Sequence, residues 1–554
     1  MPRSRPETPV ARRTTRRAPA AALRTATAVA VALLGAAPRL SLAQQQQQQA
    51  ASSATDTAAG AKQRYAATNA AGDTVWGALY RRDLDAARAV IAADHPGVVD
   101  RGNPAFARTL ASAYDEAVMA APSVTDYASY RVALTRFGNR FQDAHLAIGA
   151  RESRPTADRT RDAGIYPAYR SSGGKDAAFV VVSADAARYG ALADELRGAT
   201  LLDCDGRPAA AVFRDGVLAW RGRPSVEADG YAWAPYLLVD FGPPTAAAPA
   251  SCRARTGAGR TVTVPLRWAS VTDSSRAALA AAARASSGYA DHPLGVRALD
   301  GGKELWVDLP TFAVNGDSAS AVMRATIDTL RARLASGGAW DLLVLDLRGN
   351  SGGSSVWGDE IASAIFGAAW ARQARAWLND GVYTEWRVSK DNVEAVRGQV
   401  KQLETRHGAD SPQAAGARAF ADSMAAALAR GDLLYSPGHA ARQGLTRPTA
   451  PPLPGKVVVV TTASCFSACL DFLDVMRLHP AVVQVGQPTG VDTDYMENWG
   501  WPLPSGLSQI GYPMKVYRNR RRANNEGYAP QVRRDDLADT NALAEWIRRD
   551  YQKW

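Results

Sequence analysis

A run of consecutive valines that leads into a serine-containing turn constrains the fold most. Residues 455–472 read GKVVVVTTASCFSACLDF. A short, continuous β-branched run of this kind is typical of a fully buried strand. Because an amphipathic helix follows at once, the turn between them must be a sharp strand-to-helix corner. A serine at that corner, Ser464 or Ser467, can present its hydroxyl to a cleft, with the helix N-terminus pointing at it.

A second buried strand runs into a glycine-rich loop about a hundred residues earlier. Residues 345–353 read LDLRGNSGG. Glycines let backbone N–H groups turn toward a ligand because no Cβ stands in the way. A serine corner combined with an amide-lined loop is suited to acyl transfer.

Further motifs follow these two in a recognisable order. The loop DLRGN-x-GG and the Ser-Ala pair at a helix start are accompanied by VGQPTG at 485–490, FQDAHLAI at 141–148 and EGYAP at 526–530. Over roughly residues 75 to 540 the chain resembles the S41 family of serine peptidases, the tail-specific or C-terminal-processing peptidases, of the tricorn-core type. The resemblance implies an α/β fold with a ClpP/crotonase-like core, preceded by a helical N-terminal cap and a PDZ-like β module.

The pattern of the sequence divides the chain into seven parts. We expect a signal peptide at 1–43, a disordered leader at 44–61, a helical N-terminal domain at 62–155, a PDZ-like domain at 160–270, the first part of the peptidase core at 280–371, a helical insertion at 372–450, and the second part of the core with a C-terminal helix at 451–554.

The first 43 residues favour export. They contain repeated arginines, a short apolar run at 26–37 and small residues at positions 41 and 43, as in a secretory signal peptide. We therefore expect a periplasmic or secreted protein with no integral membrane span after cleavage; an uncleaved signal anchor is the alternative. The same residues carry eight arginines and one glutamate, so the net charge of +11 falls to +4 without them. No nucleic-acid partner is indicated, and the basic run at 518–522 is expected to be a solvated hairpin.

Four cysteines remain to be explained in a chain expected to be exported. Disulfides are permitted outside the cytosol, and Cys204 with Cys252 is a plausible bridge. Cys465 and Cys469 could pair, but we expect them to be small buried residues. No CxxC pair or His-Glu cluster suggests a metal, and no cofactor is expected.

Ser467 is the predicted nucleophile, because the resemblance places the catalytic serine before an alanine at a helix start. Ser464 is the competitor, with an N-cap of the same helix as its structural role. The oxyanion hole is expected from the backbone amides of Ala468 and of Gly352 or Gly353. Asn350 and Arg348 are expected to hold the shape of the glycine loop.

The general base follows from the resemblance in two possible ways. The best-known members use a lysine about 25 residues after the serine, where this chain has Asp492. Tricorn-like members use an N-terminal histidine, and His145 of the Asp-Ala-His motif matches it with a pKa suited to the task. We therefore predict a Ser–His pair. His95 and His292 each precede a proline and are expected to be turn residues.

The group that orients His145 is less clearly marked. The tricorn-like pattern implies a late glutamate, for which Glu526 is the candidate, with Asp143 and Asn525 as rivals. The chain departs from the family at Ala144, where tricorn-like sites have a serine, and at Leu470, where an acidic residue is usual.

The sequence thus predicts a secreted serine endopeptidase acting on peptides or proteins through an acyl-enzyme. The departures from the family motivate an alternative, a non-catalytic homologue that binds peptides or other ligands in the same cleft. An esterase-type acyl hydrolase is a third possibility. The oligomeric state is left open.

Overall fold

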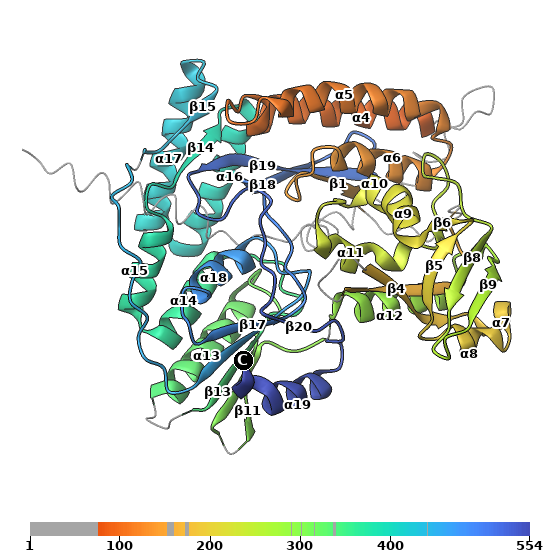
Figure 1. The fold of residues 1–554 in the computed structure, drawn as a ribbon. Helices are drawn as coiled ribbons and strands as arrows, with labels where there is room; N and C mark the ends of the chain where they lie inside the picture. Colours follow the sequence, from red (N-terminus) through yellow and green to blue (C-terminus); the bar gives the residue numbers. More distant parts are fainter. Residues whose placement is uncertain are drawn as a thin grey trace, which may run out of the picture.

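The computed structural model describes residues 76–151, 160–171, 177–289, 291–300, 302–314, 316–335, 340–439 and 441–554. The expected signal peptide and leader lie outside these residues. The described chain has a mixed α/β fold with four sheets. Helices line one side of the molecule, and a separate β module lies beside the central core (Figure 1).

The core is a six-stranded sheet. Its order is β11 (Gly295–Asp300), β12 (Glu304–Asp308), β13 (Leu342–Asp346), β16 (Lys456–Thr461), β17 (Val482–Gly486) and β20 (Val532–Arg533). All neighbours pair in parallel except β11 and β12. Every residue of β13 and β17 is buried, as are the four valines of β16. The valine run is therefore a fully buried strand, as predicted.

Helices cover both faces of this sheet because alternate strand residues point to opposite sides. Leu343 and Val457 pack with α13 (Gly316–Ala335), α14 (Ser355–Phe366) and α18 (Ala468–Met476). Val344 and Val458 pack on the other face with α19 (Thr540–Asp550). The serine corner and the glycine loop both lie at the carboxyl ends of strands, where open α/β sheets commonly bind ligands.

The N-terminal part is helical and ends in a strand. The helices α4 (Trp76–Asp94), α5 (Ala105–Ala120) and α6 (Tyr127–Asn139) precede β1 (Ala147–Ala150). Strand β1 pairs antiparallel with β19 (Ser508–Arg518), which also pairs with β18 (Tyr495–Pro502). In Figure 1 these helices lie along one side with the β18–β19 sheet beneath them. The Asp-Ala-His motif is thereby carried to the C-terminal half of the chain.

The expected helical insertion also supplies two strands. Its start lies within α15 (Ala368–Leu378), and it contains β14 (Tyr383–Arg387), α16 (Lys390–His407), α17 (Pro412–Ala429) and β15 (Leu434–Tyr435). Strand β14 pairs with β19, so the segment is built into the β18–β19 sheet rather than attached outside it. The sequence YTEWR is rich in β-favouring residues, which explains the strand.

Residues 160–270 form a β module with short helices. Its sheet has the order β3 (Ile165–Ser171), β4 (Ala177–Ala184), β5 (Thr200–Cys204), β8 (Ser251–Arg255) and β9 (Thr261–Pro265), with β6 (Arg207–Pro208) beside β5. Cys204 lies opposite Cys252 in the ladder, and the two form a disulfide, which confirms that pairing. Whether the module is of the PDZ type stays a prediction.

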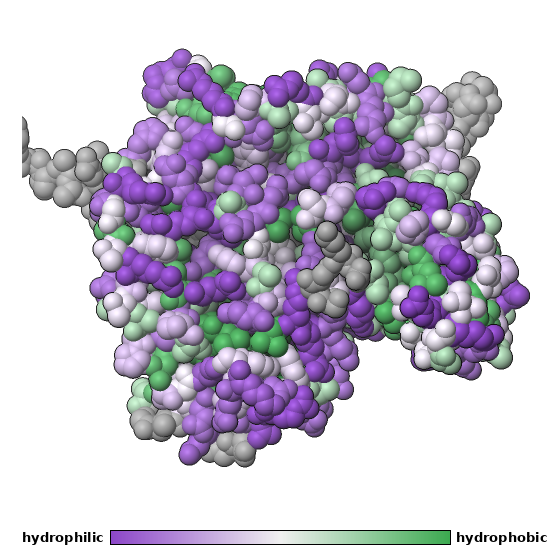
Figure 2. All heavy atoms as spheres, in the orientation of Figure 1, coloured by the Kyte–Doolittle hydropathy of each residue, from purple (hydrophilic) through white to green (hydrophobic). Residues whose placement is uncertain are grey.

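The remaining described elements are short or peripheral. They are α7 (Ala186–Tyr189), α8 (Leu192–Leu196), α9 (Ala209–Phe213), α10 (Ala219–Arg221), α11 (Glu227–Trp233), α12 (Asp273–Ser287), β2 (Arg161–Asp162), β7 (Val239–Asp240), β10 (Ala269–Ser270), the 3₁₀ turns at Pro96–Val98, Ala121–Ser123, Ala234–Tyr236 and Tyr551–Lys553, and a π turn at Arg214–Leu218. Among the described helices none combines the length and apolar character needed to cross a bilayer. Figure 2 shows a face on which hydrophobic residues form small groups among hydrophilic ones.

Candidate active site

Ser467 stands at a strained corner between β16 and α18. Its backbone has φ 56° and ψ −124°, and it is the N-cap residue of α18 without a capping hydrogen bond from its side chain. An L-residue adopts such a conformation only when its surroundings impose it, at a cost of order 1–3 kcal/mol. Ser464, the competing serine, does not cap the helix; its hydroxyl lies 2.7 Å from the Thr462 hydroxyl. The geometry therefore singles out Ser467.

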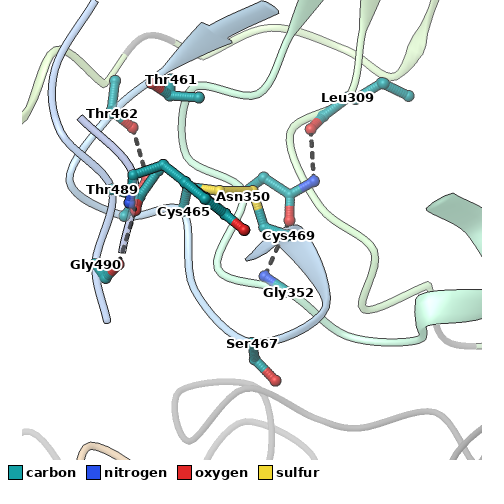
Figure 3. Close-up of a disulfide and its surroundings, with 12 residues drawn as sticks. Leu309, Asn350, Gly352, Thr461, Thr462, Cys465, Ser467, Cys469, Thr489 and Gly490 are labelled. Atoms are coloured by element: carbon teal, nitrogen blue, oxygen red, sulfur yellow. Dashed lines mark hydrogen bonds between the residues drawn. A yellow bond between two sulfur atoms is a disulfide. The ribbon is translucent and has the colours of Figure 1, made fainter. Parts of the chain in front are cut away.

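The cysteines that flank Ser467 are bonded to each other. Cys465 and Cys469 form a disulfide, whereas the sequence led us to expect two unpaired buried residues. Cys465 precedes the corner and Cys469 lies in the first turn of α18; their Cα atoms are 5.4 Å apart, which is within the usual range for a bridge. In Figure 3 the Ser467 side chain points away from the disulfide.

The glycine loop after β13 packs directly against this corner. Gly352 has φ 94°, and a Cβ placed on it would lie 2.9 Å from Cβ of Ser467. The Asn350 side chain donates to the Leu309 carbonyl at 2.9 Å and accepts the N–H of Gly352 at 2.9 Å (Figure 3). Asn350 thus holds the loop, as predicted.

Two of the three expected oxyanion donors keep an unused N–H group. The N–H of Gly352 is occupied by Asn350. By contrast, the N–H groups of Gly353 and Ala468 make no hydrogen bond to another described residue. Ala468 is the first residue of α18, where an N–H has no partner within the helix.

His145 lies beside the serine corner although it comes from the N-terminal part of the chain. Its ring centroid is 4.6 Å from that of Phe466, the residue before Ser467. The imidazole is largely buried, and the backbone N–H of His145 donates to Asp143 Oδ1 at 2.9 Å. The pairing of β1 with β19 carries the histidine to this place.

His95 is part of the support of this motif, which the sequence did not indicate. His95 is a turn residue, as expected, because it caps the 3₁₀ turn Pro96–Val98. It is also fully buried and stacks on Phe106 at 4.3 Å. Its Nδ1 accepts the N–H of Gly97, and its Nε2 lies 3.5 Å from Asp143 Oδ2. Burial lowers the pKa of His95, which favours the neutral ring. Because Nδ1 accepts the N–H of Gly97, a neutral ring carries its proton on Nε2. For Asp143, burial raises the pKa, but His95 and His145 outweigh it and the net pKa is lowered.

Asp492 contacts the nucleophile's backbone. Its Oδ1 accepts the N–H of Ser467 at 3.0 Å, and its Oδ2 accepts Arg522 Nη1 at 2.8 Å. Arg522 also bonds Asp471 and Asp474 of α18. Only 5% of Arg522 is exposed, so this part of the basic run is a buried ion-pair cluster, not the solvated hairpin expected. Its three carboxylates were not recognisable as partners because they come from two segments.

Glu526 is placed beside Asp492 by its backbone. The two residues form an isolated antiparallel bridge, and the N–H of Asn525 donates to the Asp492 carbonyl at 2.6 Å. The Glu526 side chain is exposed, and its Oε2 accepts the N–H of Ala523 at 2.6 Å. Its described contacts do not include His145.

His292 does not form a turn as expected; its side chain contacts the start of the glycine loop. Its Nδ1 lies 3.0 Å from Asp308 Oδ1, and its Nε2 lies 2.9 Å from the Arg348 carbonyl. His292, Asp308 and Asp346 are close enough to hold a metal ion. However, both imidazole nitrogens are engaged, and Asp346 is bound by the guanidinium of Arg348. These contacts describe a structural cluster.

Comparison with solved structures supports the fold. A crystal structure of mature CPAF matches with a TM-score of 0.51 and 14% sequence identity, covering 83% of this chain and 93% of that chain. The structure of a CPAF mutant matches with a TM-score of 0.53 and 13% identity, covering 86% and 96%. No curated protein shows significant sequence similarity to the chain.

The family model for peptidase family S41 matches residues 305–533, from β12 to β20. This range contains the glycine loop, the serine corner, Asp492 and Glu526. The match supports peptidase activity and implies peptide or protein substrates. Over residues 305–533, the chain is therefore similar to peptidase family S41.

Proposed function

We propose that this protein is an exported serine endopeptidase in which Ser467 is the nucleophile and His145 is the general base. The observation that carries the proposal is the strained Ser467 corner, packed against the glycine loop, with the His145 ring next to Phe466. A serine hydroxyl is a weak nucleophile until an adjacent base removes its proton, and a neutral imidazole suits that task near pH 7.

The reaction proceeds through an acyl-enzyme. His145 takes the proton of Ser467 as Oγ attacks the carbonyl carbon of the peptide, and the carbonyl oxygen becomes an oxyanion. The N–H groups of Ala468 and Gly353 point to an oxyanion hole because neither is used by another described residue. His145 then returns the proton to the leaving amine, and a water molecule, activated by the same base, releases the product acid.

We assign the orientation of His145 to Glu526, with Asp143 as the rival. Glu526 is held by its backbone beside Asp492, which itself bonds Ser467. Asp143 already accepts the backbone N–H of His145. Glu526→Gln should lower kcat if its carboxylate turns from Ala523 toward His145 when substrate binds. If Glu526→Gln retains wild-type kcat while Asp143→Asn does not, the role belongs to Asp143.

Export agrees with the chemistry of the four cysteines. Both pairs form disulfides, and such bonds persist mainly outside the cytosol. Expression with the N-terminal residues present, followed by fractionation and N-terminal sequencing, tests the proposed cleavage after residue 43. Recovery of the uncleaved chain in the membrane fraction would favour a signal anchor.

The experiment that tests the proposed activity is cleavage of a mixed peptide library by residues 44–554, followed by mass spectrometry. Ser467→Ala and His145→Ala serve as the matched variants, with circular dichroism to show that all three proteins are folded. We expect cleavage by the wild type that both variants lose. Cleavage retained by Ser467→Ala would overturn the nucleophile assignment. Peptide binding without cleavage by the folded wild type would instead indicate a non-catalytic homologue.

A further inference from the structure

Two adjacent residues, Asp492 and Thr493, connect the two halves of the site. Asp492 Oδ1 accepts the N–H of Ser467 at 3.0 Å. The hydroxyl of Thr493 donates to Asp143 Oδ1 at 2.8 Å, and the same oxygen accepts the N–H of His145 at 2.9 Å. One dipeptide therefore reaches the nucleophile on one side and the segment of the base on the other.

These contacts are sheltered from water. The exposed fractions are 1% for Asp492, 4% for Thr493 and 6% for Asp143. Hydrogen bonds in such surroundings are stronger than in water, and a donor or acceptor left without its partner is costly. The contacts are therefore able to fix the positions of the groups they join.

Both ends of the dipeptide are anchored in turn. Arg522 bonds Asp492 at 2.8 Å and also bonds Asp471 and Asp474 on α18, the helix that begins after Ser467. Burial raises the pKa of Asp471, but Arg520, Arg522 and Arg375 lower it to about 2, so this carboxylate is ionised. The anchor thus holds Asp492 and the serine helix as one unit.

The other end continues into the sheet that carries His145. Strand β18 begins at Tyr495, whose N–H donates to the Thr493 hydroxyl at 3.3 Å. Strand β18 pairs with β19, and β19 pairs with β1, directly after the Asp-Ala-His motif. The dipeptide lies where the serine unit meets this sheet.

We propose that Asp492 and Thr493 are positioning residues that set the distance and orientation between Ser467 and His145. Asp492 occupies the position at which the lysine general base is found in other members of the resembled family. In this chain it accepts the backbone N–H of Ser467 and does not take the proton of the hydroxyl. The inference rests on the proposed Ser–His function and adds the residues that keep the pair in register.

The physical consequence falls on the chemical step rather than on substrate binding. Displacing reacting groups by about 1 Å can cost about 100-fold in rate. For Asp492→Ala we expect kcat to fall about 10- to 100-fold, with KM within about twofold of the wild type. Asp492→Asn keeps a carbonyl oxygen for the N–H of Ser467 and should lose less.

The threonine offers a cleaner pair of variants. Thr493→Val removes the hydroxyl at nearly constant volume and should lower kcat about tenfold. Thr493→Ser keeps the donor and should recover most of that loss. If Thr493 acts through Asp143, adding Thr493→Val to Asp143→Asn should cost little more, because residues that act as a unit are not additive.

The test measures kcat and KM on a cleaved library peptide, together with the rate at which a fluorophosphonate labels Ser467. The labelling rate depends on how well the base activates the Ser467 hydroxyl, and it is measured without a bound peptide. Thr326→Val is the matched control, since Thr326 is a buried threonine whose hydroxyl donates within α13, away from the site. Thermal unfolding of every variant shows that it is folded, and if Asp492→Ala does not fold, Asp492→Asn and the Thr493 variants carry the test.

The possible results distinguish failure of the proposed Ser–His function from failure of the positioning role of Asp492 and Thr493. A folded wild type that neither cleaves peptides nor labels at Ser467 would overturn the proposed function and this inference with it. An active wild type, with Ser467→Ala inactive but Asp492→Ala and Thr493→Val at wild-type kcat and labelling rate, would overturn the positioning role alone. Losses in kcat at constant KM, with Thr493→Ser rescued and Thr326→Val unaffected, would establish it.

Discussion

The disulfide between Cys465 and Cys469 spans the three residues of the serine corner, Phe466, Ser467 and Ala468. A covalent link across so short a segment removes few conformations from the unfolded chain as a whole. It does restrict the corner itself, where Ser467 is held at a positive φ. Its main consequence should therefore be for activity.

Removal of this disulfide is expected to impair catalysis more than stability. For Cys465→Ala/Cys469→Ala we expect kcat to fall about tenfold, because the serine is less well placed. The matched control is Cys204→Ala/Cys252→Ala, whose bridge closes a sequence separation of 48 against 4. That variant should lose about 2–4 kcal/mol of stability and keep its kcat, because longer closed loops give larger entropic stabilisation. Peptide hydrolysis and urea unfolding of both variants check this, and the reverse pattern would contradict it.

Gly352 should tolerate no side chain. In Gly352→Ala the new Cβ would lie 2.6 Å from the Phe466 carbonyl oxygen and 2.9 Å from Ser467 Cβ, which forces the serine corner to move. We expect at least about a 100-fold loss in kcat/KM. Gly367→Ala is the control, because Gly367 also has a positive φ of 85° but its Cβ would meet nothing within 4 Å. Equal losses of activity in the two variants would show that backbone conformation, not the clash, is responsible.

The buried His95 should make the fold sensitive to mild acid. Its pKa is lowered from 6.5, mainly by burial, so the unfolded chain takes up a proton before the folded one does. The contribution of His95 to the free energy of unfolding should therefore be fully present above about pH 6.5. It should be lost as the pH decreases through the lowered pKa of the folded state. Urea unfolding at about pH 7.5 and 5.5 should show a smaller decrease for His95→Asn than for the wild type.

His292 supplies a control of opposite sign for that experiment. Burial lowers its pKa, but Asp308, Asp346 and the Arg348 carbonyl outweigh burial and raise it above 6.5. The contribution of His292 to the free energy of unfolding is fully present below about pH 6.5. It is lost as the pH rises through the raised pKa of the folded state. The acid-dependent loss should thus be larger in His292→Asn than in the wild type. An unchanged pH dependence in both variants would contradict the assignments.

Removing Arg348 alone should destabilise the fold strongly, whereas replacing both Arg348 and Asp346 by apolar residues should cost much less stability. Both side chains are fully buried, and Arg348 also donates to the Leu537 carbonyl and the Thr540 hydroxyl, joining the glycine loop to the C-terminal helix. Arg348→Met leaves a buried carboxylate without its partner, which typically costs about 3–5 kcal/mol. Asp346→Leu/Arg348→Met should recover much of this cost. Denaturant unfolding measures it, and additive losses in the double variant would refute the coupling.

Much of the core could be predicted because its signals are local. The valine run gave the buried strand β16, and the leucine-rich segment before Arg348 gave β13. Cys204 and Cys252 were paired correctly. The two strands within the insertion were missed. The residues of β14 favour a strand, but its partner β19 lies more than a hundred residues away in sequence.

In the candidate site, too, the residues in short characteristic motifs were predicted, and the residues that depend on distant parts of the chain were not. Ser467 and the glycine loop are marked by their own residues, since a nucleophile corner and an amide-lined loop each require a particular short sequence. His95 and Arg522 carry no such mark. His95 was expected only to be a turn residue and Arg522 to be part of a solvated hairpin, and each is buried by partners from other segments.

The sequence by itself determined the resemblance to peptidase family S41, the central parallel strands and the residues expected to carry the chemistry, because these depend on short patterns of hydrophobic, glycine and serine residues. Only the tertiary structure decided what holds those residues in place. The bond from Asp492 to Ser467, the bond from Thr493 to Asp143 and the Cys465–Cys469 bridge depend on distances between atoms. Hydrogen bonds and disulfides form only when folding brings such atoms within a few ångströms, and composition and spacing do not specify those distances.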